Sequence, residues 1–498
     1  MAIETELKLA LTPATARQLP AHPLLAGCAM RHDAMLSTYY DTPQQELAAL
    51  GVVIRLRKKG RQWLFTVKST ESASGGLARR QEWECPTLPD HFEFACVDDL
   101  KLRRRLAKLA PRCTALFTTR FRRTAWLVDC GASRIELALD RGRIESNGRQ
   151  VPICELELEL VNGEVGDLFV LARRLQDDFD LRPMIASKAE RGYAVFTGQQ
   201  PKPCKAAPTI LQAAMTPVGA FRQIALNCLA HLQRNELTGP IHDDPEYVHQ
   251  ARIALRRMRS ALKLFAPLLP QDFVEAYGDV WKTLAGALGE ARNWDVFIAE
   301  ILPPLANTFP GLRDIGRLRR AGKQRSTTAR QSVKALFVSP EYARVLLAFT
   351  ALVLALPEDA GTTLKDFALQ RLEAHVGKAR RLAGRLKKMD GEARHALRIQ
   401  LKKLRYTLEF FAPLWPQQQT RPYLAALAQL QEELGRINDH ITARTLIAEV
   451  LGQRHPGPIH SWIAGRHALL LDELPEALAT WQAQPSPWKS GQSSLAKT

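Results

Sequence analysis

The segment Glu4-Thr5-Glu6-Leu7-Lys8 places a charged side chain at every second position near the start of the chain. Successive side chains of a β-strand point to opposite faces, so two carboxylates and an ammonium would share one face and largely apolar groups the other. A single strand of this kind normally exposes its charged face to water. The segment decides the fold only if the same pattern recurs further along the chain.

The alternation does recur, in about eight segments of residues 1–200. Some segments present acids (Glu4, Glu6, Glu136, Asp140, Glu155, Glu157, Glu159) and others present bases (Arg55, Arg57, Lys68, Arg120, Arg122). An open sandwich would mix charged and neutral polar groups on its wet face, so we expect a closed barrel with the charges inside and helices covering its apolar outside. Buried charges are costly unless balanced. A phosphate chain held by Arg and Lys, with a divalent metal between it and the carboxylates, would balance them.

Some charged residues of this half could be exposed to solvent and have no role in the site. Arg122 could be a solvated strand end, and Glu84 is expected at the surface. Among Glu155, Glu157 and Glu159, Glu155 is the one most readily assigned to solvent. The charge runs Arg79–Arg80 and Arg103–Arg105 are expected on exposed faces.

The ordered series resembles the CYTH superfamily, the triphosphate tunnel metalloenzymes, whose signature is ExExK. The resemblance covers roughly residues 1–200. It is carried by Glu4-x-Glu6-x-Lys8, Tyr39-Tyr40-Asp41, Arg55-x-Arg57, Lys68, Glu82, Arg120, Glu136 with Asp140, Glu155-Leu-Glu157-Leu-Glu159 and Ser187-Lys188. It implies an eight-stranded antiparallel β tunnel, a requirement for Mg²⁺ or Mn²⁺, and a substrate bearing a triphosphate.

The resemblance also implies site roles for metal-assisted phosphoryl transfer to water. The catalytic residues would be Glu4, Glu6, Lys8 and Lys68. The phosphate ligands would be Lys8, Arg55, Arg57, Lys68, Arg120, Arg122 and Lys188. The metal ligands would be Glu4, Glu6, Glu136, Asp140, Glu157 and Glu159. Glu82 could join either group.

The composition changes after residue 200. The Pro-rich stretch 201–214 is predicted to be a linker. After it, strand patterns nearly disappear and the apolar residues of 215–485 follow helical spacing. Residues 486–498 are expected to form a disordered tail. Residues 201–498 hold 40 Lys or Arg against 26 Asp or Glu, which is +14 of the total net charge of +18. We therefore expect an α+β chain of two domains whose second half binds polyanions.

The second half contains a duplication. The segment beginning at His249 matches the segment beginning at His395 at an offset of 146 residues, and later pairs keep that offset. In each copy the basic residues recur at a spacing that places them on one face of a helix. They are Arg252, Arg256 and Arg259 in the first copy and Arg398, Lys402 and Arg405 in the second. Few acids are interleaved, so each face repels itself unless a polyanion is bound.

This pattern resembles the CHAD domain, a module of two related helical bundles associated with inorganic polyphosphate, over about residues 215–480. The resemblance implies polyphosphate contacts from these six basic residues, with His249 and His395 as contacts or helix-packing groups. The copies differ at several positions: Glu409 stands where the first copy has Lys263, and Arg436 stands opposite Glu290.

The leading hypothesis is a metal-dependent inorganic triphosphatase that cleaves tripolyphosphate and carries a polyphosphate-binding helical domain. The alternatives are a thiamine triphosphatase or adenylate cyclase with the same tunnel, and a non-catalytic polyphosphate- or nucleic-acid-binding scaffold. No RNA-recognition signature, zinc finger or helix-turn-helix supports nucleic acid. Eight scattered cysteines without a CxxC pair, and no signal peptide or membrane span, predict a cytoplasmic protein.

Overall fold

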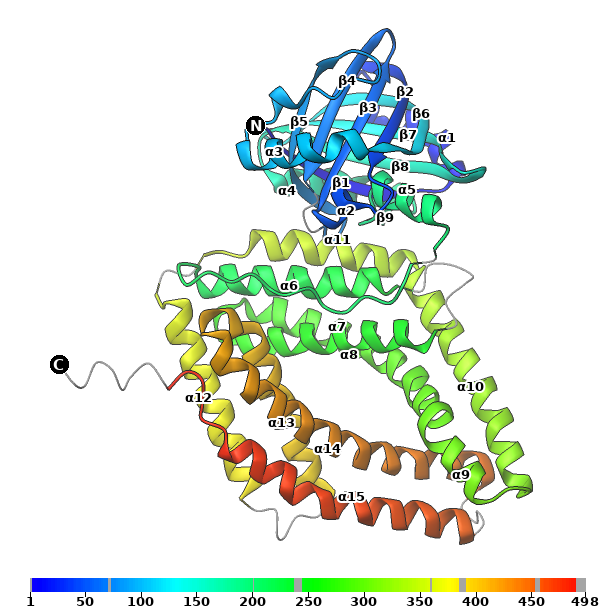
Figure 1. The fold of residues 1–498 in the computed structure, drawn as a ribbon, viewed down its shortest axis with the longest axis vertical. Coiled ribbons are helices and arrows are strands. Elements are labelled where there is room, and N and C mark those ends of the chain that lie inside the picture. Colours follow the sequence, from blue (N-terminus) through cyan, green and yellow to red (C-terminus); the bar gives the residue numbers. More distant parts are fainter. Residues whose placement is uncertain are drawn as a thin grey trace, which may run out of the picture. The chain divides into compact units, whose positions relative to one another are not determined.

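The computed structural model describes residues 2–69, 73–199, 201–236, 244–358, 361–384, 391–452 and 457–489. The chain divides into two compact units (Figure 1). The first unit comprises residues 1–203 and 338–355, and the second comprises residues 204–337 and 356–498. Most of the tail expected at 486–498 lies outside the described residues, which end at 489.

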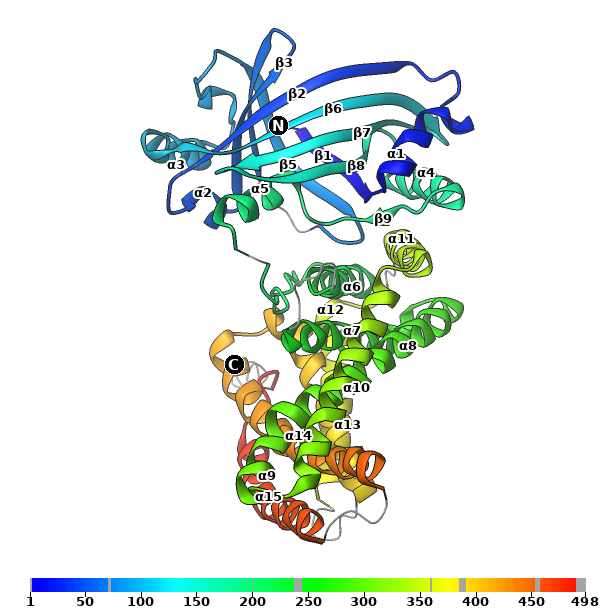
Figure 2. The same cartoon turned by 90° about the vertical axis from the view of Figure 1, so that its right-hand side faces the viewer.

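The first unit is built on a closed antiparallel barrel of eight strands, which confirms the predicted fold class. The strands are β1 (Ala2–Ala10), β2 (Met30–Asp41), β3 (Val52–Lys59), β4 (Gln62–Ser69), β5 (Leu77–Thr87), β6 (Thr114–Cys130), β7 (Ser133–Ser146) and β8 (Arg149–Asn162). Their order is β5-β4-β3-β2-β6-β7-β8-β1, and pairing of β1 with β5 closes the barrel (Figure 2). A two-residue strand, β9 (Arg182–Pro183), pairs with the end of β1.

The strand alternation gives the barrel an apolar outer layer and a charged interior. Leu7 and Leu9 of β1 are fully buried and share a core with the leucines of β8 and with α4 (Val165–Asp178). On the other face of β1, Glu6 and Lys8 are also buried, with 3% and 5% exposure. Both faces of this strand are therefore shielded from water, unlike those of an ordinary amphipathic strand.

Short helices complete the barrel. They are α1 (Pro13–Gln18), α2 (Glu46–Ala49), α3 (Leu100–Leu109) and α5 (Lys188–Thr197). Ser187 and Glu190 form a reciprocal capping box that fixes the start of α5. This cap places Lys188 at the first helical position, where its ammonium contacts carboxylates of β7 and β8 inside the barrel.

A helix from the middle of the helical sequence belongs to the first unit. It is α11 (Pro340–Ala355), and its Leu347 is fully buried in the core formed by β1, β8 and α4. The Arg344 guanidinium donates to the Gln176 carbonyl at the end of α4, at 3.5 Å. Nothing in the sequence indicates that this helix packs against the barrel.

The second unit consists of helices. They are α6 (Pro217–Arg234), α7 (Pro245–Phe265), α8 (Gln271–Val296), α9 (Leu302–Thr308), α10 (Arg313–Phe337), α12 (Leu364–Ala383), α13 (Gly391–Phe411), α14 (Gln417–Leu451) and α15 (Gly457–Ala483). Both ends of α7 and α13 are 146 residues apart, as are the starts of α8 and α14, so the sequence repeat is a structural repeat. The copies diverge where a π-helical turn, Phe297–Ile301, follows α8, whereas α14 continues to Leu451.

Within the described part of the chain no single helix has the length and apolarity of a membrane span. The consecutive helices α10 and α11 meet that test only when the two are taken together.

Candidate functional site

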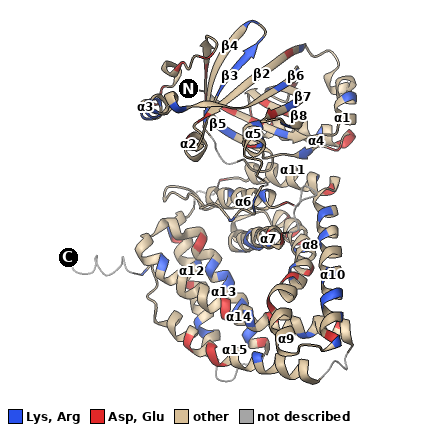
Figure 3. Ribbon diagram, turned by 45° about the vertical axis from the view of Figure 1, so that its right-hand side comes forward, with Lys and Arg blue, Asp and Glu red and all other residues tan. Residues whose placement is uncertain are grey.

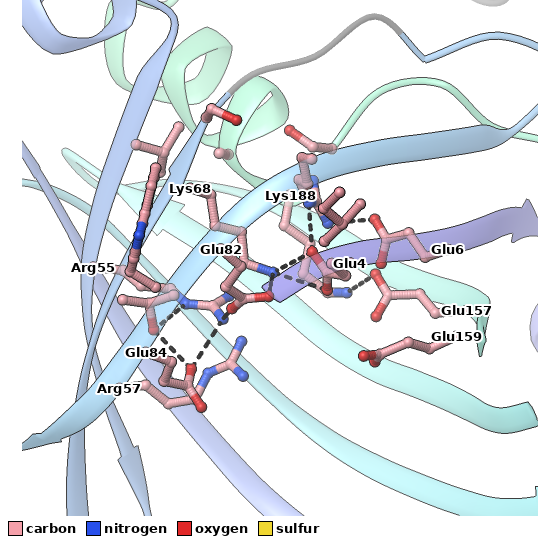
Figure 4. Close-up of a pocket in the computed structure, with 18 of the residues that line it drawn as sticks. Glu4, Glu6, Arg55, Arg57, Lys68, Glu82, Glu84, Glu157, Glu159 and Lys188 are labelled. Atoms are coloured by element: carbon pink, nitrogen blue, oxygen red, sulfur yellow. Dashed lines mark hydrogen bonds and ion pairs between the residues drawn. The ribbon is translucent and has the colours of Figure 1, made fainter. Parts of the chain in front are cut away.

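The barrel encloses a cavity of about 700 Å³ whose walls are charged (Figure 4). The charged lining residues come from six strands and one helix. They are Glu4, Glu6, Lys8, Arg55, Arg57, Lys68, Arg80, Glu82, Glu84, Arg123, Glu157, Glu159 and Lys188. The cavity therefore holds most of the residues that the sequence assigned to the site.

The guanidinium groups of β3 form the basic wall of the cavity. Arg55 Nε donates to Thr66 Oγ1 at 3.2 Å, and Arg55 lies 3.5 Å from Glu82 and 3.7 Å from Glu84. Arg57 donates to Ser37 Oγ at 3.1 Å and has no carboxylate within 4 Å among the described residues. Burial, and then the charge of Arg55, lower the pKa of Arg57 to about 10. A buried cation without a counter-charge is well placed to receive an anion.

Cations of β4 and β5 hold the acids of β1. Lys68 Nζ lies 2.8 Å from Glu4 and 2.9 Å from Glu82. Arg80 binds Glu4 through Nε at 2.6 Å and also contacts Glu6. Burial would raise the pKa of the Glu4 carboxyl, but Lys68 and Arg80 together outweigh it and lower that pKa. The Glu4 carboxylate is therefore ionised and available as a ligand.

A second group of acids lies deeper in the barrel, around Lys188. The carboxylates of Asp140, Glu155 and Glu157 have oxygens within 4.8 Å of one another, a spacing that could hold a metal ion. Lys188 Nζ already lies 2.7, 2.5 and 2.9 Å from these three groups. Burial alone would lower the pKa of Lys188, but the carboxylates outweigh it and raise that pKa.

Three further cations neutralise the same acids, namely Lys8, Arg123 and Arg191. Three carboxylates thus face four cations in this group. An added divalent ion would meet an excess of positive charge, so the spacing alone does not make this a good metal site.

Glu159 provides the better indication of a metal site. Across the described residues it has neither an ion pair nor a hydrogen bond. Burial, followed by the charge of Glu4, raises the pKa of Glu159 to about 7. Glu6 lies directly opposite Glu159 in the register of β1 and β8. Carboxylate oxygens are the ligands that Mg²⁺ and Mn²⁺ prefer, so Glu159, which no cation holds among the described residues, is a candidate ligand of a divalent ion together with Glu6 opposite it.

Glu136, also predicted as a metal ligand, lies at the edge of this acidic group. It is opposite Glu159 in the register of β7 and β8 and contributes to the raised pKa of Glu159. Its carboxylate lies 3.4 Å from Arg31, a residue that the sequence did not single out. Asp140, by contrast, is held by Arg123 and Lys188 in the deeper group.

The structure does not bring Arg120 and Arg122 into the cavity. Both are exposed, because the inward-facing positions of β6 are Thr119, Phe121 and Arg123. Arg123 binds both oxygens of Asp140, at 2.7 and 2.8 Å, in the place expected for its neighbours. The sequence run Arg120-Phe121-Arg122-Arg123 fits either phase of the alternation, so the choice could not be made from the sequence.

Two other expectations were wrong. Glu155 was assigned to solvent, yet it has 0% exposure and binds Lys188 and Arg191. Arg80 was assigned to an exposed run, yet it lines the cavity. Arg80 alternates in phase with Glu82 and Glu84, and that phase is the signal that would have placed it inside. Glu84, expected at the surface, is exposed, and it also lines the cavity and accepts a hydrogen bond from Thr66 Oγ1 at 2.8 Å.

In the second unit, the basic faces of α7 and α13 influence each other. Burial, then the charge of Arg256 and next that of Arg398, lower the pKa of Arg252 to about 10. The same physical causes lower the pKa of Lys402 to about 6. Arg256 contacts the Tyr406 hydroxyl and lies 5.4 Å from the centre of that ring. Cations of α7 and α13, one helix from each copy of the repeat, therefore lie close enough to repel one another. Figure 3 shows the positions of Lys and Arg along α13, and along α10 as well.

The remaining members of the predicted polyphosphate set differ in their surroundings. Burial, then the charge of Arg292, lower the pKa of His249 to about 4. His395 is exposed. Arg405 pairs with Glu409 on its own helix at 2.6 Å, and Arg259 lies close enough to Lys263 to lower the pKa of that ammonium, after burial.

The sequence matches agree with this architecture. The CYTH domain family model matches residues 2–193, and the CHAD domain family model matches residues 223–448. The chain is 34% identical over 201 residues to an inorganic triphosphatase of Haemophilus influenzae. That match covers 39% of the chain and 56% of the relative, so it spans little more than half of the relative's length.

Two solved structures of other proteins are similar to parts of this chain. The CHAD domain of Ricinus communis is 31% identical, with 57% of this chain and 98% of that chain covered and a TM-score of 0.48. A putative adenylyl cyclase from Hippeastrum, described as having a dominant triphosphatase activity, is 17% identical, with 40% and 97% covered and a TM-score of 0.30.

Proposed function

We propose that the barrel hydrolyses inorganic triphosphate to diphosphate and phosphate with the help of Mg²⁺ or Mn²⁺. The observation that carries this proposal is the partition of the cavity wall. The Arg57 guanidinium, which has no carboxylate partner among the described residues, stands on one side, and the Glu159 carboxylate, which has no cation partner there, stands on the other. A linear phosphate chain with a divalent ion satisfies both sides at once.

The chain's own residues would bind and position the substrate. Arg55 and Arg57 would take phosphate oxygens on the basic wall, while Lys68 would exchange part of its contact with Glu4 for a phosphate. Lys8, Arg123 and Lys188 are available deeper in the cavity. Phosphoryl transfer needs position and charge neutralisation more than covalent chemistry, which such a wall supplies.

The divalent ion would be held by Glu4, Glu6 and Glu159. When bound, it supplies charge neutralisation of the phosphate oxygens and a water of lowered pKa. Arg80 contacts both Glu4 and Glu6, and these ion pairs orient the two carboxylates toward the cavity.

The match to an inorganic triphosphatase supports the substrate class. For the helical unit, we propose that the cations of α7 and α13 bind inorganic polyphosphate, because their mutual repulsion would be relieved by a polyanion. All eight cysteines are free thiols, which supports a reducing compartment such as the cytoplasm.

The test is a phosphate-release assay with tripolyphosphate, ATP and thiamine triphosphate, each with Mg²⁺, with Mn²⁺ and with a chelator. We expect tripolyphosphate to be preferred and the chelator to abolish release. Glu6→Gln should remove metal-dependent turnover while circular dichroism stays unchanged, and the exposed Glu164→Gln serves as the matched control. Turnover of Glu6→Gln near that of the unmodified protein would remove Glu6 from the site, and a preference for ATP or thiamine triphosphate would refute the substrate assignment.

A further inference from the structure

A basic hollow of about 520 Å³ lies on the first unit, separate from the charged cavity of the barrel. Four exposed cations line it, namely Lys58, Arg120, Arg122 and Arg141. They surround Leu36, and no acidic residue is among those that line the hollow. It includes the two arginines that the sequence assigned to the cavity and that the structure places elsewhere.

Strand alternation shows that these cations face outward. Their immediate neighbours Arg57, Arg123 and Asp140 point into the barrel, where Arg123 holds Asp140. Side chains one residue away on the same strands therefore point away from the barrel axis. The four cations and the cavity are thus on opposite faces of β3, β6 and β7.

The register of β6 and β7 places like charges directly opposite each other. Arg122 lies opposite Arg141, and Arg120 lies opposite Arg143. Like charges in this position destabilise a sheet. Arg143 is relieved by a contact with Glu145, but Arg120, Arg122 and Arg141 have no carboxylate within 4 Å in the described ranges. This exposed sheet face is therefore electrostatically unfavourable unless an anion covers it.

We propose that this hollow binds a segment of extended inorganic polyphosphate. Neighbouring strands are roughly 4.8 Å apart and alternate residues along a strand roughly 6.6 Å apart, so the cations form a grid that a phosphate chain can follow. Nucleic acid is disfavoured, because single strands bind proteins through exposed aromatic side chains as well as cations. Phe121 is the aromatic residue that lines the hollow, and it is 4% exposed.

The site lies outside the catalytic cavity, and the inference stands whether or not the barrel hydrolyses triphosphate. It gives the first unit a binding surface of its own for chains longer than the cavity accommodates. Lys58 of β3 extends this row of cations across the sheet. In the register, Leu36 of β2 lies between Lys58 on one side and Arg120 of β6 on the other.

The experiment uses the full chain carrying Arg256→Glu and Lys402→Glu, which removes the proposed helical contribution. Into this background Arg122→Glu and Arg141→Glu are introduced, and binding of labelled long-chain polyphosphate is measured by fluorescence anisotropy. We expect about a tenfold or larger loss of affinity and a shallower salt dependence. The matched control reverses Arg17 and Arg173, two exposed arginines of α1 and α4 with the same total charge change.

An equal loss in the control pair, or no loss in the hollow variant, would overturn the proposal. Equal loss of binding to single-stranded RNA of matched charge would also overturn it, in favour of a general polyanion surface. Tripolyphosphate hydrolysis is measured in parallel, so failure of the hollow and failure of the catalytic proposal remain separate results. Arg122→Gln with Arg141→Gln guards against misfolding: removal of like-charge repulsion should leave the melting temperature unchanged or higher while binding still falls.

Discussion

Lys402 gives the sharpest prediction for the helical unit, because its charge state should change when a polyanion binds. Burial, and then neighbouring cations, lower the pKa of its ammonium to about 6. The charged groups that act on it lie on α7, α13 and α14, and they are Arg252, Arg256, Arg398 and Asp439. At neutral pH the free protein therefore holds Lys402 largely as a neutral amine.

Polyphosphate prefers the ammonium form of Lys402, so binding above pH 6 must be accompanied by uptake of a proton. The affinity for polyphosphate is therefore highest below pH 6. It falls as the pH rises from 6 toward the higher pKa that Lys402 has in the complex. About half of the free protein carries the ammonium at pH 6 and about 1% at pH 8. Affinity should therefore drop by about 50-fold between these values if Lys402 contacts the chain.

The assay is isothermal titration calorimetry with long-chain polyphosphate between pH 6 and pH 8. Using buffers of different ionisation enthalpy counts the protons taken up. Lys402→Arg should flatten the pH profile, because guanidinium stays protonated throughout. His249→Gln tests the histidine of this cluster, whose pKa is lowered to about 4, and it should leave the slope above pH 7 unchanged.

A Lys402→Arg variant that keeps the full pH dependence would refute this reasoning. So would an unmodified protein whose affinity is constant from pH 6 to pH 8, since either result would mean that the Lys402 ammonium does not face the ligand.

Three further predictions concern the division of labour and the fold. Arg256→Glu with Lys402→Glu should weaken polyphosphate binding at least about tenfold and leave tripolyphosphate release within about twofold; equal losses in titration and phosphate release would mean one shared site. Leu347→Ala should lower the free energy of unfolding of the first unit by roughly 2–5 kcal/mol, because its side chain is fully buried; an unchanged denaturant midpoint would contradict this. Asp41→Ala should destabilise the barrel by roughly 1–3 kcal/mol, because Asp41 accepts three backbone N–H bonds and the Tyr193 hydroxyl; the melting temperature checks it.

The alternation of acids and bases was sufficient to predict the barrel and most of its inner wall. It succeeds where one phase of a strand is clearly apolar, as in β1, whose buried leucines leave Glu6 and Lys8 no alternative face. It fails in β6, where both phases carry arginine and only pairing with β7 decides that Arg123 faces inward.

The helical repeat could be located from the sequence because both copies keep the same offset. What the sequence could not supply were contacts between segments distant in the chain. The burial of Glu155 depends on Lys188 and Arg191 of α5, which lie more than thirty residues away. Arg252 and Arg256, two of the cations that lower the pKa of Lys402, likewise come from a different helix, α7.

The position of α11 has a consequence for how the chain can be divided. Residues 338–355 belong to the barrel unit, whereas the stretches before and after them belong to the helical unit, so the polypeptide passes between the units three times. A protease cut in the Pro-rich stretch near residue 203 would leave the two parts joined through the remaining crossings. A recombinant fragment ending there would lack α11 and uncover leucines of its own hydrophobic layer. An exchange of one unit for another by joining chains at the Pro-rich stretch would therefore separate α11 from the barrel.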